Sequence, residues 1–247
     1  MNSINITTIL NNETKNYNFT TLYSVIVNKN ENSKYNIYIL NNSEYNIEKE
    51  IELMQKNKSN VNIKEIKTND KYPLLKLKKY LPKNINKIIF LNYNTIVLKD
   101  LSELFNHSIM NKTIAGILDY NISILKNERD FDYQTNKYIN TSVLLIDLEK
   151  FKDISDETEY YFKEQTTINK NIFDSFLLNY RYGLINDKDL NLNLELSNKK
   201  HILENVLDGI NNTNIIIFKK YPWENLYVIY GDLWIKYYTQ FIYLLNN

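Results

Sequence analysis

Apolar and polar residues alternate in blocks along the first hundred residues, and each block has the length and period of one strand or one helix. Strands are expected at Ile4–Leu10, Asn36–Leu40, Val61–Ile66 and Ile88–Leu91, and helices at Phe19–Val27, Ile47–Lys56 and Pro73–Tyr80. Proline cannot continue an α-helix, so Pro82 ends the third of these helices. This alternation predicts an α/β protein with a mostly parallel sheet that helices cover on both faces.

The pattern continues beyond residue 110. Further strands are expected at Ile114–Leu118, Ser142–Leu148 and Ile215–Phe218, and helices from about Asp156 and Asn171. We expect one α/β domain over residues 1–222 and an aromatic-rich helical extension over residues 223–247. The charges of Asp232 and Lys236 argue against a membrane-spanning helix in that extension. It is expected to pack on the domain through Trp223 and Trp234, with at most a peripheral membrane contact.

Composition narrows the class of protein. A chain of 247 residues with 43% apolar residues can bury one substantial core. Because 30 basic and 29 acidic residues leave a net charge of +1, nucleic acid is not an expected partner. The absence of cysteine excludes disulfides and thiolate metal sites. The first residues lack a basic segment followed by an apolar one, so a cytoplasmic location is expected.

The most informative stretch runs from Ile88 to Phe105. It joins a buried strand, a polar turn with Asn92 and Asn94, a second apolar run, and Asp100-Leu-Ser-Glu103. The spacing of Asp100 and Glu103 is typical of a capped helix start, which gives both residues a structural role first.

This stretch resembles the centre of the retaining glycosyltransferases of family 8, the group of glycogenin and the lipopolysaccharide galactosyltransferases. The resemblance continues in four later segments, which are Ile114–Tyr120, Tyr138–Phe151, Asp174–Asn179 and Ile215–Trp223. It implies the GT-A type nucleotide-diphospho-sugar transferase fold. It also implies transfer of a hexose from a UDP-sugar to a glycan acceptor, with a manganese ion at the family's Asp-x-Asp motif.

The metal-binding positions of the family are changed here. Asn92 and Asn94 replace the two aspartates, and Ile217 stands where the metal-binding histidine would fall. At an effective dielectric constant near 20, one pair of unit charges about 4 Å apart is worth roughly 4 kcal/mol. Two neutral amides lose that attraction twice, so no metal cofactor is expected, and Mn²⁺ follows from family analogy alone.

The resemblance also assigns the remaining site residues. Alignment without a gap places Thr14 where the family has the aromatic residue that faces the uracil. The positions implied for nucleotide-sugar binding are Asn11, Asn12, Asn92, Asn94, Asn140, Lys219 and Lys220. Those implied for catalysis or sugar contact are Asp119, Asp174 and Ser175, the last replacing a glutamine. Lys219 and Lys220 could stabilise a diphosphate leaving group without metal, or they could be a solvated pair.

Three hypotheses follow. The first is a retaining hexosyltransferase with altered metal and uridine contacts. The second is a catalytically inactive protein of this fold that regulates an active glycosyltransferase as its partner. The third is a binding module for glycans or anions, which would use the old cleft or the basic segment Lys71–Lys87, whose lysines otherwise form a solvated helix face.

Overall fold

The computed structural model describes residues 3–56, 58–109, 112–118, 139–153, 182–184, 213–218, 221–224, 228 and 230–247. Its centre is a seven-stranded sheet with the strand order β3-β2-β1-β4-β7-β6-β8. The strands are β1 Ile4–Leu10, β2 Tyr35–Asn41, β3 Val61–Lys67, β4 Lys87–Leu91, β6 Ile114–Leu118, β7 Ile139–Asp147 and β8 Tyr182–Leu184. A second, antiparallel sheet pairs β5, Thr95–Val97, with β9, Ile215–Ile217.

Most neighbours in the large sheet are parallel, as the alternation of strands and helices predicts. β3, β2, β1 and β4 run in one direction, and β6 is parallel to β8. β7 is antiparallel to both of its neighbours, β4 and β6. Together with the helices this is a mixed α/β architecture, which confirms the expected fold class.

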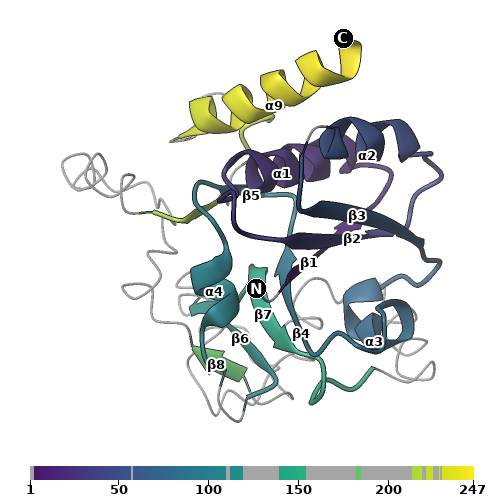
Figure 1. The fold of residues 1–247 in the computed structure, drawn as a ribbon, viewed down its shortest axis with the longest axis vertical. Coiled ribbons are helices and arrows are strands. Elements are labelled where there is room, and N and C mark those ends of the chain that lie inside the picture. The colour runs from purple at the N-terminus through teal and green to yellow at the C-terminus, as the bar shows by residue number, and fades with distance from the viewer. Residues whose placement is uncertain are drawn as a thin grey trace, which may run out of the picture.

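Helices lie on both faces of this sheet. They are α1 Lys15–Val27, α2 Glu48–Gln55, the 3₁₀ turn η1 Pro73–Lys76, α3 Leu77–Tyr80, α4 Ser102–Asn106 and α9 Gly231–Asn246. Figure 1 shows α1 and α2 over one face of β1–β3, α9 outside them, and α3 on the other side of the sheet.

Strand residues alternate between two cores, as a period of two residues requires. Ile37, Ile39 and Ile89 pack with residues of α1 and α2 on one face. On the other face, Tyr38, Leu40, Ile88 and Phe90 pack with leucines of η1 and α3. Burial on both faces explains why these strands are continuous apolar runs in the sequence.

Three elements differ from the prediction by more than one residue at an end, or in helix type. α1 begins at Lys15 rather than Phe19, and β7 begins at Ile139 rather than Ser142. The helix expected over Pro73–Tyr80 is a 3₁₀ turn followed by one α-turn. In that short helix the backbone N–H groups of Lys78 and Lys79 donate to the carboxylate of Asp153, at 2.9 and 2.7 Å. The helices expected from Asp156 and Asn171 lie outside the described residues.

The C-terminal helix α9 packs on α1. Phe241 stacks on Phe19 with ring centroids 5.5 Å apart, and the Asn28 side chain donates to the Tyr237 hydroxyl at 2.8 Å. Trp234 is 3% exposed. The division of the chain at residues 222 and 223 stays a prediction. No described helix combines the length and the apolar character that crossing a membrane requires.

We expect Phe241→Ala to lower the free energy of unfolding by about 3–5 kcal/mol, because it empties a fully buried site and removes the ring from Phe19. Urea denaturation followed by circular dichroism measures this loss. Tyr243→Ala is the control on the same helix, since Tyr243 is 70% exposed, and it should cost less than about 0.5 kcal/mol. Equal losses for the two variants would contradict the packing of α9 on α1.

Candidate functional site

The expected site lies where β1 and β4 end. These strands are parallel neighbours, yet the chain continues from β1 to β2 on one side of the sheet and later enters β4 on the other side. In open α/β sheets, ligands bind at the carboxyl ends of strands where the strand order reverses in this way. Asn11 and Asn12 directly follow β1, and Asn92 directly follows β4.

A side-chain network closes the turn after β1. The Asn11 side-chain oxygen accepts from the backbone N–H of Thr14 at 3.0 Å and from its hydroxyl at 2.8 Å. The Asn18 amide donates to Thr14 Oγ1 at 2.8 Å, and its oxygen accepts from the Thr8 hydroxyl at 2.7 Å. Thr14 is 6% exposed. Because Thr14 is bound into its own turn, it offers no flat surface for a base, and the network explains why α1 begins at Lys15.

Asn12 has a different environment from Asn11. Its side chain is exposed, and its oxygen accepts from the backbone N–H of Glu44 at 3.2 Å, in the segment that follows β2. This hydrogen bond joins the chain segments after β1 and β2. Asn12 is therefore the more accessible of the two expected nucleotide-sugar contacts in this turn.

The turn after β4 is fixed from several directions. The backbone N–H of Asn92 donates to the carbonyl of Ser142 in β7 at 2.9 Å. The Asn92 side-chain oxygen accepts from the N–H of Tyr93 at 2.9 Å, and the Thr95 hydroxyl donates to the Asn92 carbonyl at 2.7 Å. The Thr21 hydroxyl of α1 donates to the Thr95 carbonyl at 2.7 Å. The turn is thus positioned by both the sheet and α1.

Asn94 makes two hydrogen bonds to the backbone of Phe218, one as donor and one as acceptor. Its side-chain nitrogen donates to the Phe218 carbonyl at 2.9 Å, and its own carbonyl accepts from the Phe218 N–H at 2.8 Å. The partner is a carbonyl, so the atom that faces it must be the NH₂ group rather than the amide oxygen. The amide oxygen is buried without a hydrogen-bond partner, and the residue is 8% exposed. A carboxylate has no proton to donate to Phe218 at neutral pH.

The side chains present do not fit a manganese ion. Asn94 and Asn92 offer two neutral oxygens, of which the first is buried and the second already accepts from Tyr93. Ile217, which the resemblance places at the family's histidine position, is an aliphatic side chain packed in the core at 6% exposure. Within the described ranges, no three histidine, cysteine or acidic residues are grouped as metal ligands. Manganese prefers anionic oxygens, and this donor set has none.

Asn140 lies on β7, the strand beside β4, and is buried. Its side-chain oxygen accepts from the backbone N–H of Ser142 at 2.8 Å, so this amide shapes the strand next to the turn. The other expected contacts lie outside the described residues, and their roles stay predictions; they are Asp119, Asp174, Ser175, Lys219 and Lys220.

Asp100 is structural, and it accepts from the first backbone N–H of α4, as expected, although the N-cap residue is Leu101. Its carboxylate accepts from the N–H of Ser102 at 2.9 Å, from the N–H of Asn30 at 2.9 Å and from the Tyr35 hydroxyl at 2.7 Å. Position N-cap of α4 is Leu101, which has no side-chain cap. Burial raises the pKa of Asp100, but these hydrogen bonds outweigh burial and lower it. The carboxylate joins α4 to the α1–β2 connection.

Residues 3–175 match the family described as Glycosyl transferase family 8. The chain belongs to this family. A protein of Haemophilus influenzae named "Putative glycosyltransferase" is 36% identical over 85 residues, which are 33% of this chain and 25% of that protein. The chain therefore matches about a quarter of the length of this curated relative.

Solved structures share the family 8 fold at low sequence identity. The galactosyltransferase LgtC, in complex with donor and acceptor sugar analogs, has a TM-score of 0.69 at 14% identity, with 96% of each chain covered. The bifunctional protein WbbM has a TM-score of 0.70 at 15% identity, with 96% of this chain and 49% of WbbM covered. GlyE of Streptococcus pneumoniae TIGR4 has a TM-score of 0.64 at 17% identity, with 99% and 63% covered. These neighbours confirm the GT-A fold.

The basic segment Lys71–Lys87 of this family 8 protein is partly neutralised. Asp70 accepts from the buried Lys76 ammonium at 3.3 Å and from Lys79 at 2.8 Å, and the Tyr80 hydroxyl also donates to it. Lys78 and Lys83 are exposed. An anion would therefore compete with Asp70 for Lys76 and Lys79, two of the lysines of this segment.

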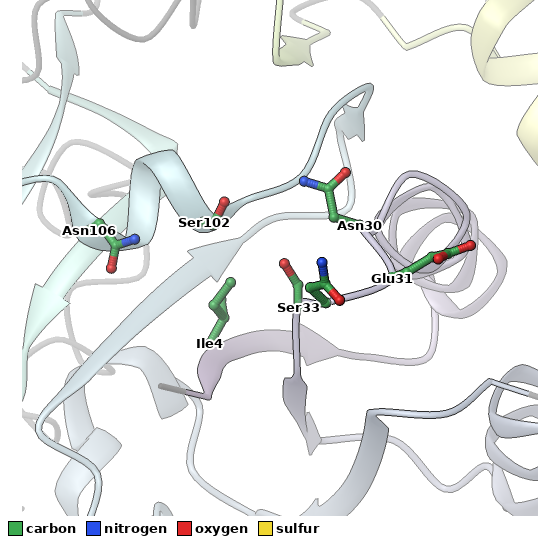
Figure 2. Close-up of a pocket in the computed structure, with 7 residues that line it drawn as sticks. Ile4, Asn30, Glu31, Ser33, Ser102 and Asn106 are labelled. Atoms are coloured by element: carbon green, nitrogen blue, oxygen red, sulfur yellow. The ribbon is translucent and has the colours of Figure 1, made fainter. Parts of the chain in front are cut away.

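A polar pocket that the sequence did not predict lies at the opposite, amino edge of the sheet. Its volume is about 650 Å³. Figure 2 shows Ser102 and Asn106 of α4 on one side, and Asn30 and Ser33 of the α1–β2 connection on the other. Its lining residues carry no periodic or motif signal that sequence inspection could detect. The pocket does not include the turns that follow β1 and β4.

We expect Asn94→Asp to lower the free energy of unfolding by about 2–4 kcal/mol at pH 7, because the carboxylate loses the hydrogen bond to Phe218 and is buried as a charge facing a carbonyl. Burial raises the pKa of the new carboxyl group above its unfolded value, so the loss should grow as pH rises and shrink in acid. Chemical denaturation at pH 4 and pH 7 measures both effects.

Asn92→Asp is the matched control, since the oxygen that accepts from Tyr93 N–H survives in a carboxylate at a half-buried position. Its cost should stay below about 1 kcal/mol. If the Asn94→Asp protein were as stable as the Asn92→Asp protein at pH 7, the bond to Phe218 would not stabilise the site.

The native protein should be about 2 kcal/mol more stable than Asp70→Asn at neutral pH, since the carboxylate accepts charge-assisted hydrogen bonds from two lysines. Burial raises the pKa of Asp70, but hydrogen bonds from Lys79, Tyr80 and Lys76 outweigh it and lower the pKa to about 2 from 3.8. The advantage is therefore present above about pH 4 and lost as pH falls through 2.

Thermal unfolding of both proteins between pH 2 and pH 7 measures this difference. Glu52→Gln neutralises an exposed carboxylate of α2 and serves as the control, with an expected change below about 0.5 kcal/mol. A difference between the native protein and Asp70→Asn that did not change with pH would contradict the assignment.

Proposed function

We propose that this family 8 protein transfers a hexose from a UDP-sugar to a glycan acceptor with retention, and that it does so without the metal ion of its family. The observation that supports transfer without a metal ion is the hydrogen bond that the Asn94 side-chain amide donates to the Phe218 carbonyl. Membership of the family supports glycosyl transfer in general. LgtC, which has the same fold, binds analogs of both a donor and an acceptor sugar, and this supports sugars as the substrates.

In this proposal the nucleotide sugar binds across the carboxyl ends of β1 and β4. Asn12 and Asn92 contact it from the two turns, whereas Asn11, Asn94 and Asn140 hold those turns in shape. The bond from the anomeric carbon to the diphosphate oxygen breaks, and UDP leaves with the bonding electron pair. The acceptor hydroxyl oxygen bonds to the anomeric carbon on the same face of the sugar, and its proton passes to the departing diphosphate. Asp119, Asp174 and Ser175 are the proposed contacts of the reacting hexose.

The leaving diphosphate requires positive charge as the glycosidic bond breaks. Lys219 and Lys220 come two and three residues after the end of β9, which pairs with β5 beside the turn that holds Asn94. We assign to these two lysines the neutralisation that a metal ion would otherwise supply. The proposal therefore makes nucleotide affinity dependent on lysine charge and independent of divalent cations.

A second candidate function is that of an inactive family 8 protein acting as the partner of an active glycosyltransferase. The observation that favours it is the turn after β1, where Asn11 and Thr14 bond to each other and Thr14 is almost fully buried. The position expected to face the base is thus used inside the protein. The third hypothesis, an anion-binding face at Lys71–Lys87, is weakened by the pairing of Lys76 and Lys79 with Asp70.

Calorimetric titration with UDP tests the proposed nucleotide site. We expect the same dissociation constant, within about twofold, in manganese and in EDTA. Lys219→Ala with Lys220→Ala should weaken binding at least about tenfold, or 1.4 kcal/mol, because both diphosphate contacts are lost. Lys78→Ala, which removes an exposed lysine far along the chain, is the control and should leave UDP affinity unchanged.

Tightening of at least about tenfold by manganese would overturn the metal-independent site. Release of UDP from UDP-hexoses in the presence of glycan acceptors then separates the first two candidates. Turnover supports the transferase, and UDP binding without turnover supports the inactive partner.

A further inference from the structure

The polar pocket at the amino edge of the sheet has two walls, which a single carboxylate joins. One wall is α4, and the other is the connection from α1 to β2 (Figure 2). One Asp100 oxygen accepts from the backbone N–H of Ser102 in α4, and the other accepts from the N–H of Asn30 in the connection, each at 2.9 Å. The Tyr35 hydroxyl donates to the same carboxylate at 2.7 Å and accepts from the N–H of Leu101 at 2.9 Å. The spacing of the two walls is therefore fixed by the protein itself.

The connection that forms the second wall is also fixed internally. The Lys29 ammonium donates to the carbonyls of Asn30 and Ser33, at 2.7 and 2.8 Å. The N–H of Ser33 donates to the Asn30 carbonyl at 3.1 Å. These hydrogen bonds occupy backbone groups and the ammonium, so they shape the wall without using its amide and hydroxyl side chains. Such pre-organisation lowers the entropy cost of binding a ligand.

The side chains that line the pocket have unused capacity for hydrogen bonds. Within the described part of the chain, the side chains of Asn30, Asn32, Ser33 and Asn106 make no hydrogen bond to another residue. Each amide can donate two hydrogen bonds and accept two, and the serine hydroxyl can donate one and accept two. The two walls together thus present donors and acceptors to one shared space.

The charges at the pocket argue against an ionic ligand. Of the described residues that line it, Glu31 alone is charged, and Figure 2 shows its carboxylate directed away from Ser102 and Asn106. Lys29 and Asp100 are occupied by the hydrogen bonds given above. An anion would lack a counter-charge here. One outward carboxylate also falls short of the several oxygen ligands that a hard metal ion requires.

We propose that this pocket binds an uncharged oligosaccharide. Each hydroxyl group of a sugar both donates and accepts a hydrogen bond, which matches the amide and hydroxyl groups of the two walls. The pocket volume of about 650 Å³ lies within the range of roughly 300–1,000 Å³ that is typical of small-molecule sites. Ile4, the apolar member of the lining, is 4% exposed, so the pocket offers little surface to a hydrophobic ligand.

The pocket is remote from the proposed nucleotide-sugar site. It lies beside Ile4, the first residue of β1, whereas that site follows Leu10, the last residue of β1. Because β1 has 7 residues and a strand rises about 3.3 Å per residue, the two sites are roughly 20 Å apart. A sugar in the pocket is therefore not the hexose that reacts. The inference goes beyond the proposed function and applies to an active transferase and an inactive partner alike.

Amide NMR spectroscopy of the full chain tests this site, because it reports which residues a weakly bound ligand contacts. The ¹⁵N-labelled protein is titrated with maltotriose and with tri-N-acetylchitotriose, two uncharged oligosaccharides, each raised to tens of millimolar. We expect saturable shifts of the side-chain NH₂ signals of Asn30, Asn32 and Asn106 with at least one of them. Since no charge takes part, the affinity should be the same in about 0.1 M and about 1 M salt.

Asn32→Ala combined with Asn106→Ala should weaken this binding about tenfold, because one amide is lost from each wall. Both side chains are exposed, so thermal unfolding should be unchanged. Asn246→Ala is the matched control, since it removes an exposed asparagine at the end of another helix, and it should leave the affinity unchanged. Glu31→Gln should also leave the affinity unchanged, because its carboxylate is directed away from the pocket.

Shifts absent from the pocket with both oligosaccharides would overturn the site, and so would shifts confined to the turns after β1 and β4. Equal shifts with inorganic phosphate, or loss of binding in Glu31→Gln, would also overturn it, since each indicates an ionic ligand. Failure of this site is distinguishable from failure of the proposed function. UDP binding is measured separately by calorimetry, and UDP should leave the pocket signals unchanged.

Discussion

The two hydrogen bonds between Asn94 and Phe218 determine how the small β5–β9 sheet meets the carboxyl edge of the large sheet. They continue the register in which Thr95 faces Ile217, and they turn Ile217 toward the core. From there the chain leads to Tyr221 and Trp223, beside Tyr93. The Asn94 side chain supplies only the donor of this pair, since the acceptor is its backbone carbonyl, and an ionised carboxylate has no such donor. The Asn94 amide thus makes a hydrogen bond at this position that a carboxylate could not make.

In this fold, packing and chemistry depend on different residues. A core needs apolar side chains of about the right total volume at the right alternation, and it accepts many exchanges among them. This explains a TM-score of 0.69 to LgtC at 14% identity. The polar turns after β1 and β4 contribute little to that packing. They can therefore be rebuilt, here into networks in which Asn11, Thr14 and Asn94 bond to the protein itself.

The sequence predicted the strands best, because a buried strand is a short apolar run that does not depend on distant partners. It missed the first turn of α1, since Lys15–Asn18 lacks apolar periodicity and is fixed instead by hydrogen bonds of Asn18 and Thr14. At the site, two asparagines at positions 92 and 94 were visible in the sequence, but the hydrogen bond that Asn94 makes to Phe218 was not. Its partner Phe218 lies 124 positions away, and no local pattern encodes that pairing.

The packing of α9 on α1 has a consequence for how the chain matures. Asn28 and Tyr237, which join these helices, are 209 positions apart. A ribosome releases α1 long before α9 is made, so the side of Phe19 that Phe241 covers stays exposed until then. Contacts of such long sequence separation slow folding and prolong the exposure of apolar surface. The nascent chain is therefore expected to be a client for chaperones that shield this surface until the last helix emerges.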